Sequence, residues 1–286
     1  MAKQTQVTPK SADVTARGIR FRYYEWPGNG PTVVMLHPSR GFARIWEFLV
    51  PHLTPEFRII ALDQRGHGDS DRPDGSYAGE DFADDLEAFL DKLNIQKCIL
   101  VGHSLGGRVG QIFAGRHPER VSKLVLVGGP HPESFGATPE MVKANNDKVA
   151  KERKALNVFD DEPAALKAVR ELWPELKEDK VRHVFQYNMK RNTDGTFSFK
   201  FDRPKVAEGL DHIVDNLTKY VGSITCPTLF LFRSHGINHL DMSGAKRIAT
   251  CYKKAPVSIE MVDGIAMVQL ENPDGVGLAV RKFLLA

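Results

Sequence analysis

The stretch that decides the fold is Val101-Gly102-His103-Ser104-Leu105-Gly106-Gly107. It lies between a short apolar run, predicted as a buried strand, and a segment predicted as a helix. A Gly-x-Ser-x-Gly sequence in this position predicts a nucleophile elbow, a sharp turn that strains the serine and needs small residues two positions to either side. The hydroxyl of Ser104 then projects from the carboxyl edge of the sheet, where the N–H of Leu105 can donate to an oxyanion.

Outward from this stretch, the chain alternates strands with helices. Short continuous apolar runs predict fully buried strands at 32–36, 58–62, 98–101 and 123–127. Apolar residues at helical spacing predict a helix at 82–93. Strands that alternate with helices indicate a mostly parallel, doubly wound sheet with helices on both faces, an α/β fold.

The segment 131–220 differs from the rest because it is rich in Lys, Glu and Asp. It contains predicted helices at 163–173 and 179–189 and a predicted hairpin at 192–201, where Asp-Gly supplies the turn. The α/β pattern resumes with strands at 228–232 and 257–262 and helices at 243–250 and 275–285. We therefore predict a flexible N-terminal tail (1–15), a core formed by 16–130 and 221–286, and an inserted, mainly helical cap (131–220).

The composition excludes several classes of protein. The chain has 286 residues, a net charge of +3, 42% hydrophobic and 26% charged residues, which is an ordinary globular mixture without a basic run for nucleic acid. No apolar run approaches the roughly 18 residues of a membrane span, and the first residues are not of signal-peptide type. Three scattered cysteines argue against a disulfide framework or a structural zinc site. We expect a cytoplasmic monomer or homodimer that binds a small molecule and neither nucleic acid nor membrane.

Five motifs together resemble the α/β-hydrolase family, and the resemblance covers roughly residues 18–285. In order they are LHP (36–38), DQRGHGDS (63–70), GHSLG (102–106), HPERV (117–121) and LENP (270–273). The resemblance implies an α/β-hydrolase fold with a helical lid, Ser104 as nucleophile and the backbone N–H groups of Leu105 and Ser39 as the oxyanion hole. The family usually has His-Gly where this chain has His37-Pro38, but the required donor belongs to Ser39.

Two positions depart from the family pattern. Relatives carry the general base in a Gly-x-Gly-His pattern about seven residues before the Asn-Pro pair, and this position holds Ala266. The acid that follows the strand at 228–232 is replaced by Ile237 or, with a one-residue slip, by Asn238. Some relatives carry the acid one strand earlier, where this chain reads Val127-Gly128-Gly129-Pro130. The triad is therefore expected to be reduced to its serine.

Other side chains are candidates for the pocket. His131 and His235 follow predicted strands at the carboxyl edge of the sheet, where sites in such sheets form. Arg40 is expected at the mouth, where it pairs with a substrate carboxylate or remains a solvated loop arginine. Trp173, in the lid, is expected to line or cover the pocket. His235 and His239 lack a convincing third ligand, so no metal is expected, and the glycine spacing of the elbow implies no dinucleotide cofactor.

Three functional hypotheses remain open. The first is a serine hydrolase that cleaves an ester, a lactone or a carbon–carbon bond. It retains its nucleophile, Ser104, but is impaired by the loss of its general base. The second is a non-hydrolytic protein that binds a ligand in the lidded pocket. The third is a repurposed or redesigned cofactor-free catalyst of the lyase type, with His131 or His235 in a new role.

Overall fold

The apolar runs of the sequence form one eight-stranded sheet in the computed structural model, which describes residues 8–235 and 242–286. The strand order is β1-β2-β4-β3-β5-β6-β10-β11; β1 and β2 are antiparallel to their neighbours and the others are parallel. The strands are β1 (Lys10–Ala16), β2 (Ile19–Trp26), β3 (Thr32–Leu36), β4 (Arg58–Leu62), β5 (Cys98–His103), β6 (Val121–Val127), β10 (Thr228–Arg233) and β11 (Val257–Val262). This architecture confirms the predicted α/β fold.

The N-terminal prediction is wrong for residues 10–15. They belong to β1, which pairs with β2 from Lys10 opposite Glu25 to Ala16 opposite Ile19. The segment reads as polar because β1 is an edge strand that is mostly exposed, so its stability comes from main-chain pairing rather than from apolar burial.

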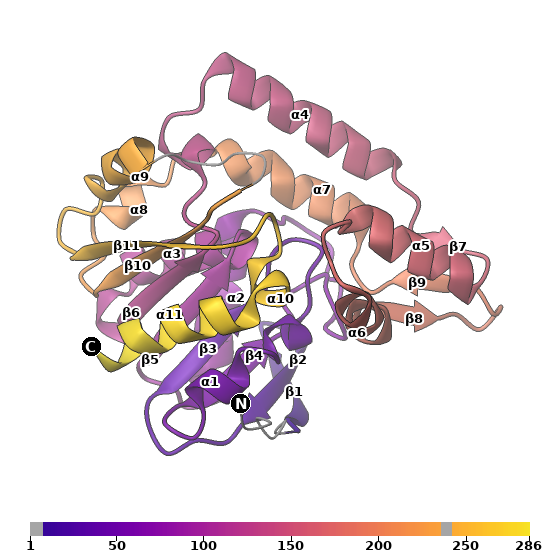
Figure 1. The fold of residues 1–286 in the computed structure, drawn as a ribbon, viewed down its shortest axis with the longest axis horizontal. Coiled ribbons are helices and arrows are strands. Elements are labelled where there is room, and N and C mark those ends of the chain that lie inside the picture. The colour runs from indigo at the N-terminus through magenta and orange to yellow at the C-terminus, as the bar shows by residue number, and fades with distance from the viewer. Residues whose placement is uncertain (1–7, 236–241) are drawn as a thin grey trace.

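Helices cover both faces of the sheet (Figure 1). One face packs against α1 (Val50–Leu53), α10 (Val268–Glu271) and α11 (Pro273–Leu285), and the other against α2 (Gly79–Lys92), α3 (Leu105–Arg116), α8 (Thr218–Val221) and α9 (Met242–Ala249). Successive strand residues alternate between the two apolar cores: Val33 belongs to the first, and Val34 to the second. Because both faces are covered, the central parallel strands β3, β4, β5 and β10 are mostly apolar and buried.

The segment between β6 and β10 leaves the sheet and forms a cap beyond its carboxyl edge (Figure 1). It contains α4 (Pro139–Lys154), α5 (Glu162–Leu172), α6 (Glu178–Asn188) and α7 (Arg203–Asp211), with α4 packed on α7. A small antiparallel sheet joins β7 (Val158–Phe159), β9 (Phe197–Phe199) and β8 (Met189–Arg191). The predicted turn at Asp-Gly is confirmed, but the hairpin begins at Met189, before the predicted range 192–201. Short 3₁₀ turns complete the chain at Ala43–Trp46, Pro118–Arg120, Pro132–Phe135 and His212–Val214.

In the described part of the chain, no helix combines the length and the apolar character needed to cross a bilayer.

Candidate active site

Ser104 occupies the turn between β5 and α3 in a strained backbone conformation, with φ +50° and ψ −111°. A side chain at Gly102 would collide with the backbone of Gly106, and one at Gly106 would collide with the carbonyl of Leu36 on β3. The two glycines are therefore required by the close approach of α3 to the sheet. This geometry is that of the predicted elbow, and it aims the Ser104 hydroxyl out of the carboxyl edge of the sheet.

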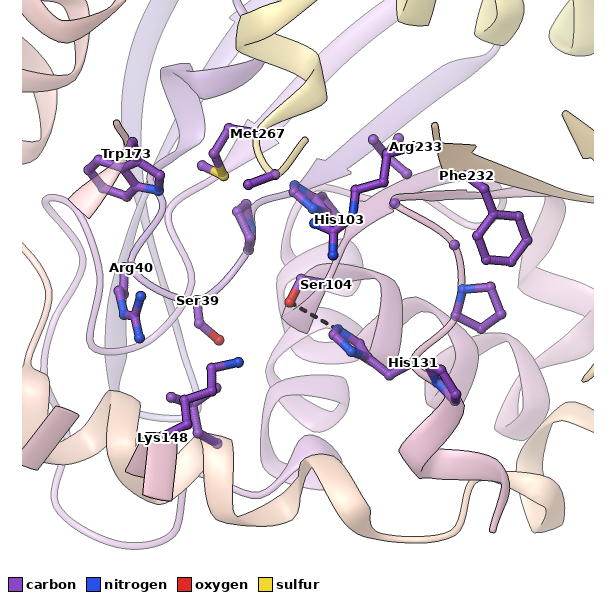
Figure 2. A pocket seen from close by; sticks show the side chains of 18 residues that line it. Ser39, Arg40, His103, Ser104, His131, Lys148, Trp173, Phe232, Arg233 and Met267 are labelled. Carbon is purple, nitrogen blue, oxygen red and sulfur yellow. Dashed lines mark hydrogen bonds between the residues drawn. The ribbon is translucent and has the colours of Figure 1, made fainter. Parts of the chain in front are cut away.

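A cavity of about 190 Å³ lies above the elbow, between the core and the cap (Figure 2). Of the residues singled out in the sequence, Ser39, Arg40, Ser104, His131, Trp173 and Ala266 line it. His235 does not line it: the ring is exposed, and its Nε2 lies 3.5 Å from Oδ1 of Asp263 at the surface. Ile237, predicted at the position of the lost acid, lies outside the described residues.

His131 is the histidine that the structure brings to the serine. Its Nε2 lies 3.1 Å from Oγ of Ser104 (Figure 2). Burial, and then the charges of Lys148 and other cations around the cavity, lower the pKa of His131 to about 3. The ring is therefore neutral near pH 7, and in the tautomer with the proton on Nδ1 its Nε2 accepts the hydrogen bond from the serine hydroxyl.

The loop that carries His131 is fixed by a buried arginine on α3. Arg108, 3% exposed, donates from Nη1 to Oγ of Ser134 (2.9 Å), and Ser134 donates to the carbonyl of Ile213 in the cap (2.7 Å). The N–H of Ser134 in turn donates to the carbonyl of His131 (3.1 Å). His131 is thus held against Ser104 by a network that joins the core helix to the cap.

A carboxylate lies behind His131. Oε2 of Glu133 is 3.8 Å from Nδ1 of His131, which is within ion-pair range but longer than a hydrogen bond. This carboxylate is placed to stabilise a positive charge on the ring when the ring accepts a proton.

The sequence predicts an oxyanion hole at the N–H groups of Leu105 and Ser39; Ser39 is among the residues that line the cavity, and Leu105 is not. The N–H of Leu105 opens α3, where the first donors of a helix have no acceptor within it. Ser39 lines the same cavity from the loop after β3, which is closed by a hydrogen bond from the N–H of Gly41 to the carbonyl of Pro38 (2.9 Å). Pro38 leaves the Ser39 donor intact, because the N–H that a proline lacks is its own.

The loop between β11 and α10 contains Ala266 at the position where the sequence comparison expects a histidine, and Glu271 fixes its backbone. The carboxylate of Glu271 accepts hydrogen bonds from the N–H groups of Ile265 (2.7 Å), Ala266 (2.8 Å) and Met267. Ala266 and Met267 line the cavity, and the methyl group at position 266 can neither accept nor donate a proton.

Two further histidines belong to the motifs: His37 has structural surroundings, and His103 lines the cavity. Nε2 of the fully buried His37 accepts the N–H of Gln64 (3.0 Å), and burial lowers its pKa well below the usual range. His103 is also buried, and burial lowers its pKa to about 3. Among the described residues, no group of three or more His, Cys, Asp or Glu side chains is placed to hold a metal ion.

Comparisons with known proteins agree with the fold described above. The family model described as "alpha/beta hydrolase fold" matches residues 31–195, more than half of the chain. The chain belongs to the α/β-hydrolase fold family. Epoxide hydrolase 4 of Mus musculus is 36% identical over 121 residues, and haloalkane dehalogenase of Mesorhizobium japonicum is 35% identical over 143 residues.

These α/β-hydrolase relatives are matched over limited stretches. The alignments cover 41% and 48% of this chain and 34% and 46% of the relatives, so the chain spans less than half the length of these curated proteins. A solved structure, E-2-(acetamidomethylene)succinate hydrolase, superposes with a TM-score of 0.83 over 97% of this chain and 100% of that chain, at 24% identity. At that identity the likeness supports the fold alone.

The α/β-hydrolase motifs do not reveal two cationic residues of the cavity, Lys148 and Arg233. Lys148 lies on α4, a polar helix without an apolar pattern strong enough to predict it. Arg233 ends β10, and its position after a buried strand at the carboxyl edge is the signal that could have identified it.

Proposed function

We propose that this chain is a serine hydrolase for a carboxylic ester or lactone, in which His131 acts as the general base in place of the histidine missing at position 266. The observation that carries the proposal is the 3.1 Å contact between Nε2 of His131 and Oγ of Ser104. A base within hydrogen-bond reach of the nucleophile is the first geometric requirement for general base catalysis.

In the acylation step, Oγ of Ser104 attacks the carbonyl carbon while Nε2 of His131 takes the hydroxyl proton. The carbonyl oxygen becomes an oxyanion that accepts hydrogen bonds from the N–H groups of Leu105 and Ser39. When the intermediate collapses, His131 gives its proton to the leaving alkoxide, and the acyl group stays on Ser104.

In the deacylation step, water replaces the alcohol. His131 takes a proton from the water as it attacks the acyl carbonyl, the same N–H groups hold the second oxyanion, and the proton returns to Ser104 as the acid leaves. The products are a carboxylic acid and an alcohol, or a hydroxy acid from a lactone.

The surroundings of His131 predict a slow enzyme. Burial and neighbouring cations disfavour the imidazolium that forms in each step, which is the same effect that lowers its pKa to about 3. Glu133 offsets part of this cost from 3.8 Å. We expect activated esters, whose leaving groups need little protonation, to be the best test substrates.

A ligand-binding protein is the second candidate, and the observation that favours it is the methyl group of Ala266 facing the cavity. On that hypothesis, Ser104 is a polar contact rather than a nucleophile. The strained φ of +50° at Ser104 argues for the hydrolase, because such strain costs about 1–3 kcal/mol and is concentrated at functional sites.

The test compares 4-nitrophenyl butyrate hydrolysis and the rate of labelling by a fluorophosphonate in the wild type, Ser104→Ala, His131→Gln and His235→Gln. We expect Ser104→Ala to be silent and His131→Gln to lose about 10²–10⁴-fold, the usual contribution of a general base. His235→Gln is the matched control, since its ring is exposed outside the cavity, and should keep the wild-type rates. Equal rates in His131→Gln and the wild type would exclude His131 as the base, and an unlabelled wild type would favour the ligand-binding protein.

A further inference from the structure

The cavity above Ser104 is lined by cations. Arg40, Lys148 and Arg233 contribute to its wall, and no Asp or Glu side chain is among its described lining residues. Hydrolysis of a neutral ester does not require such a charge distribution. The excess of positive charge inside a partly closed cavity attracts an anionic ligand.

Lys148 extends from the cap toward the core. It lies on α4, keeps an exposed surface, and points its ammonium into the cavity toward Ser39 (Figure 2). Within the part of the chain that the structure describes, no hydrogen bond or ion pair joins this ammonium to a carboxylate. Partial desolvation of the ammonium by the surrounding protein lowers the pKa of Lys148, and the charge of Arg40 acts in the same direction while Glu133 and Glu152 oppose it.

Arg40 approaches the same cavity from the core. It has a left-handed φ of +63°, and its carbonyl accepts a hydrogen bond from Nδ2 of Asn188 in the cap (2.8 Å). One face of the guanidinium pairs with Glu152 (2.7 Å), a carboxylate that also binds Arg203 (2.8 Å). Nε of Arg40 is buried without a hydrogen-bond partner among the described residues. The guanidinium therefore adds positive charge to the cavity wall, while Glu152 compensates one side of it.

We propose that the cavity selects substrates that carry a carboxylate, bound between Lys148 of the cap and Arg40 of the core. The substrate class, which rests on the proposed hydrolase function, is then a half-ester of a short dicarboxylic acid, with its ester carbonyl at Ser104. A cavity of about 190 Å³ accommodates a short acid rather than a long acyl chain. Lysine binds a carboxylate as a point charge, and the guanidinium of Arg40, paired on one side with Glu152, adds positive charge from the core.

The same carboxylate would strengthen the catalytic base. The charged and titratable groups that face His131 are Lys148, His103, Arg108 and Arg233, which disfavour its protonation, and Glu133, which favours it. An anion bound beside Lys148 offsets the positive field at the ring. An acidic substrate therefore activates its own base, and a neutral ester does not.

A binding experiment tests the carboxylate site without requiring hydrolysis. Succinate is titrated by calorimetry into Ser104→Ala, and into the same protein carrying Lys148→Met or Lys143→Met. Lys143 is an exposed lysine of the same helix outside the cavity lining, so it is the matched control. We expect Lys148→Met to weaken succinate binding at least tenfold and Lys143→Met to leave it unchanged. Absence of binding to Ser104→Ala, or equal affinities in all three proteins, would overturn the proposal.

A kinetic experiment tests whether this site contributes to specificity. The quantity measured is the ratio of kcat/KM for monoethyl succinate to that for ethyl 4-methylpentanoate, in which an isopropyl group replaces the carboxylate. We expect the ratio to fall at least tenfold in Lys148→Met and to keep its wild-type value in Lys143→Met. Succinate binding that depends on Lys148 in a protein that hydrolyses neither ester would refute the hydrolase function alone. Hydrolysis of both esters with a ratio insensitive to Lys148 would refute the carboxylate selectivity alone.

Discussion

The position of His131 depends on Arg108, which does not line the cavity. Arg108→Met removes the 2.9 Å hydrogen bond to Ser134 and three longer contacts, at 3.4–3.5 Å, to the carbonyls of Ile213 and Asp215. The bond to Ser134 joins α3 to the loop that carries His131, and the longer contacts join α3 to the cap. We predict that the variant folds, loses stability and loses turnover because His131 moves relative to Ser104.

The magnitude follows from the contacts. A hydrogen bond from a charged donor contributes about 1.5–3 kcal/mol net, and the longer contacts contribute less, so we expect the free energy of unfolding to fall by about 3 kcal/mol. A displacement of about 1 Å between catalytic groups can cost roughly 10²-fold in rate. Because Arg108 does not touch the substrate, the loss should appear in kcat, with KM little changed.

The assay measures urea unfolding and ester hydrolysis in the same preparations. Arg65→Met is the matched control: Arg65 is also a buried arginine, paired with Asp85 (2.7 Å from Nη2), but it lies outside the cavity. We expect Arg65→Met to lose comparable stability and to keep its kcat below the unfolding transition. If folded Arg108→Met also keeps the wild-type kcat, Arg108 does not position His131.

Three other variants test separate parts of the site. Lys148→Met should raise the pKa of His131 from its depressed value of about 3, because one of the cations that lower it is removed. The acid limb of the pH–rate profile, where the base becomes protonated, should then move to higher pH. An acid limb at the wild-type pH would contradict the assignment of His131 as the base. Ala266→His, made in the His131→Gln protein, should raise the rate of fluorophosphonate labelling at least about tenfold, since position 266 lines the same cavity. An unchanged labelling rate would show that this loop cannot present a base to the serine. Gly106→Ala should unfold at lower temperature than the wild type in calorimetry, because the new methyl group collides with the carbonyl of Leu36, and an unchanged Tm would contradict the required close approach.

The central strands of the sheet were predictable because parallel strands buried on both faces have short, continuous apolar sequences. Strands at 32–36 and 58–62 are observed at the predicted bounds, since a strand covered on both faces reads as a continuous apolar run. The edge strand at 257–262 is also observed at its predicted bounds, although it is partly exposed. The exceptions are elements with little apolar burial. The edge strand β1 was predicted as a tail, and α4, with Asn145, Val149 and Glu152 as its buried residues, was not predicted.

Only those site residues that belong to short local sequence motifs could be predicted. The elbow at Ser104 and the alanine at position 266 follow from motifs whose members are close in the sequence. The contact of His131 with Ser104 joins the loop after β6 to the turn after β5, and its geometry depends on Arg108 and on cap carbonyls more than 100 residues further along the chain. Lys148 reaches the same cavity from the cap, a placement that no local pattern encodes.

The proposed relocation of the base to His131 is compatible with the fold because of the sheet's topology. β6 lies next to β5, so a loop that follows β6 begins beside the elbow. His131 can therefore reach Ser104 from the loop after β6, without any change in the elbow itself. The two positions differ in their surroundings: the loop at 266 is tied by Glu271, whereas His131 faces Lys148, Arg108 and Arg233. The positive charges around His131 disfavour the protonated ring that forms during catalysis. An anionic substrate offsets this effect, whereas a neutral substrate does not.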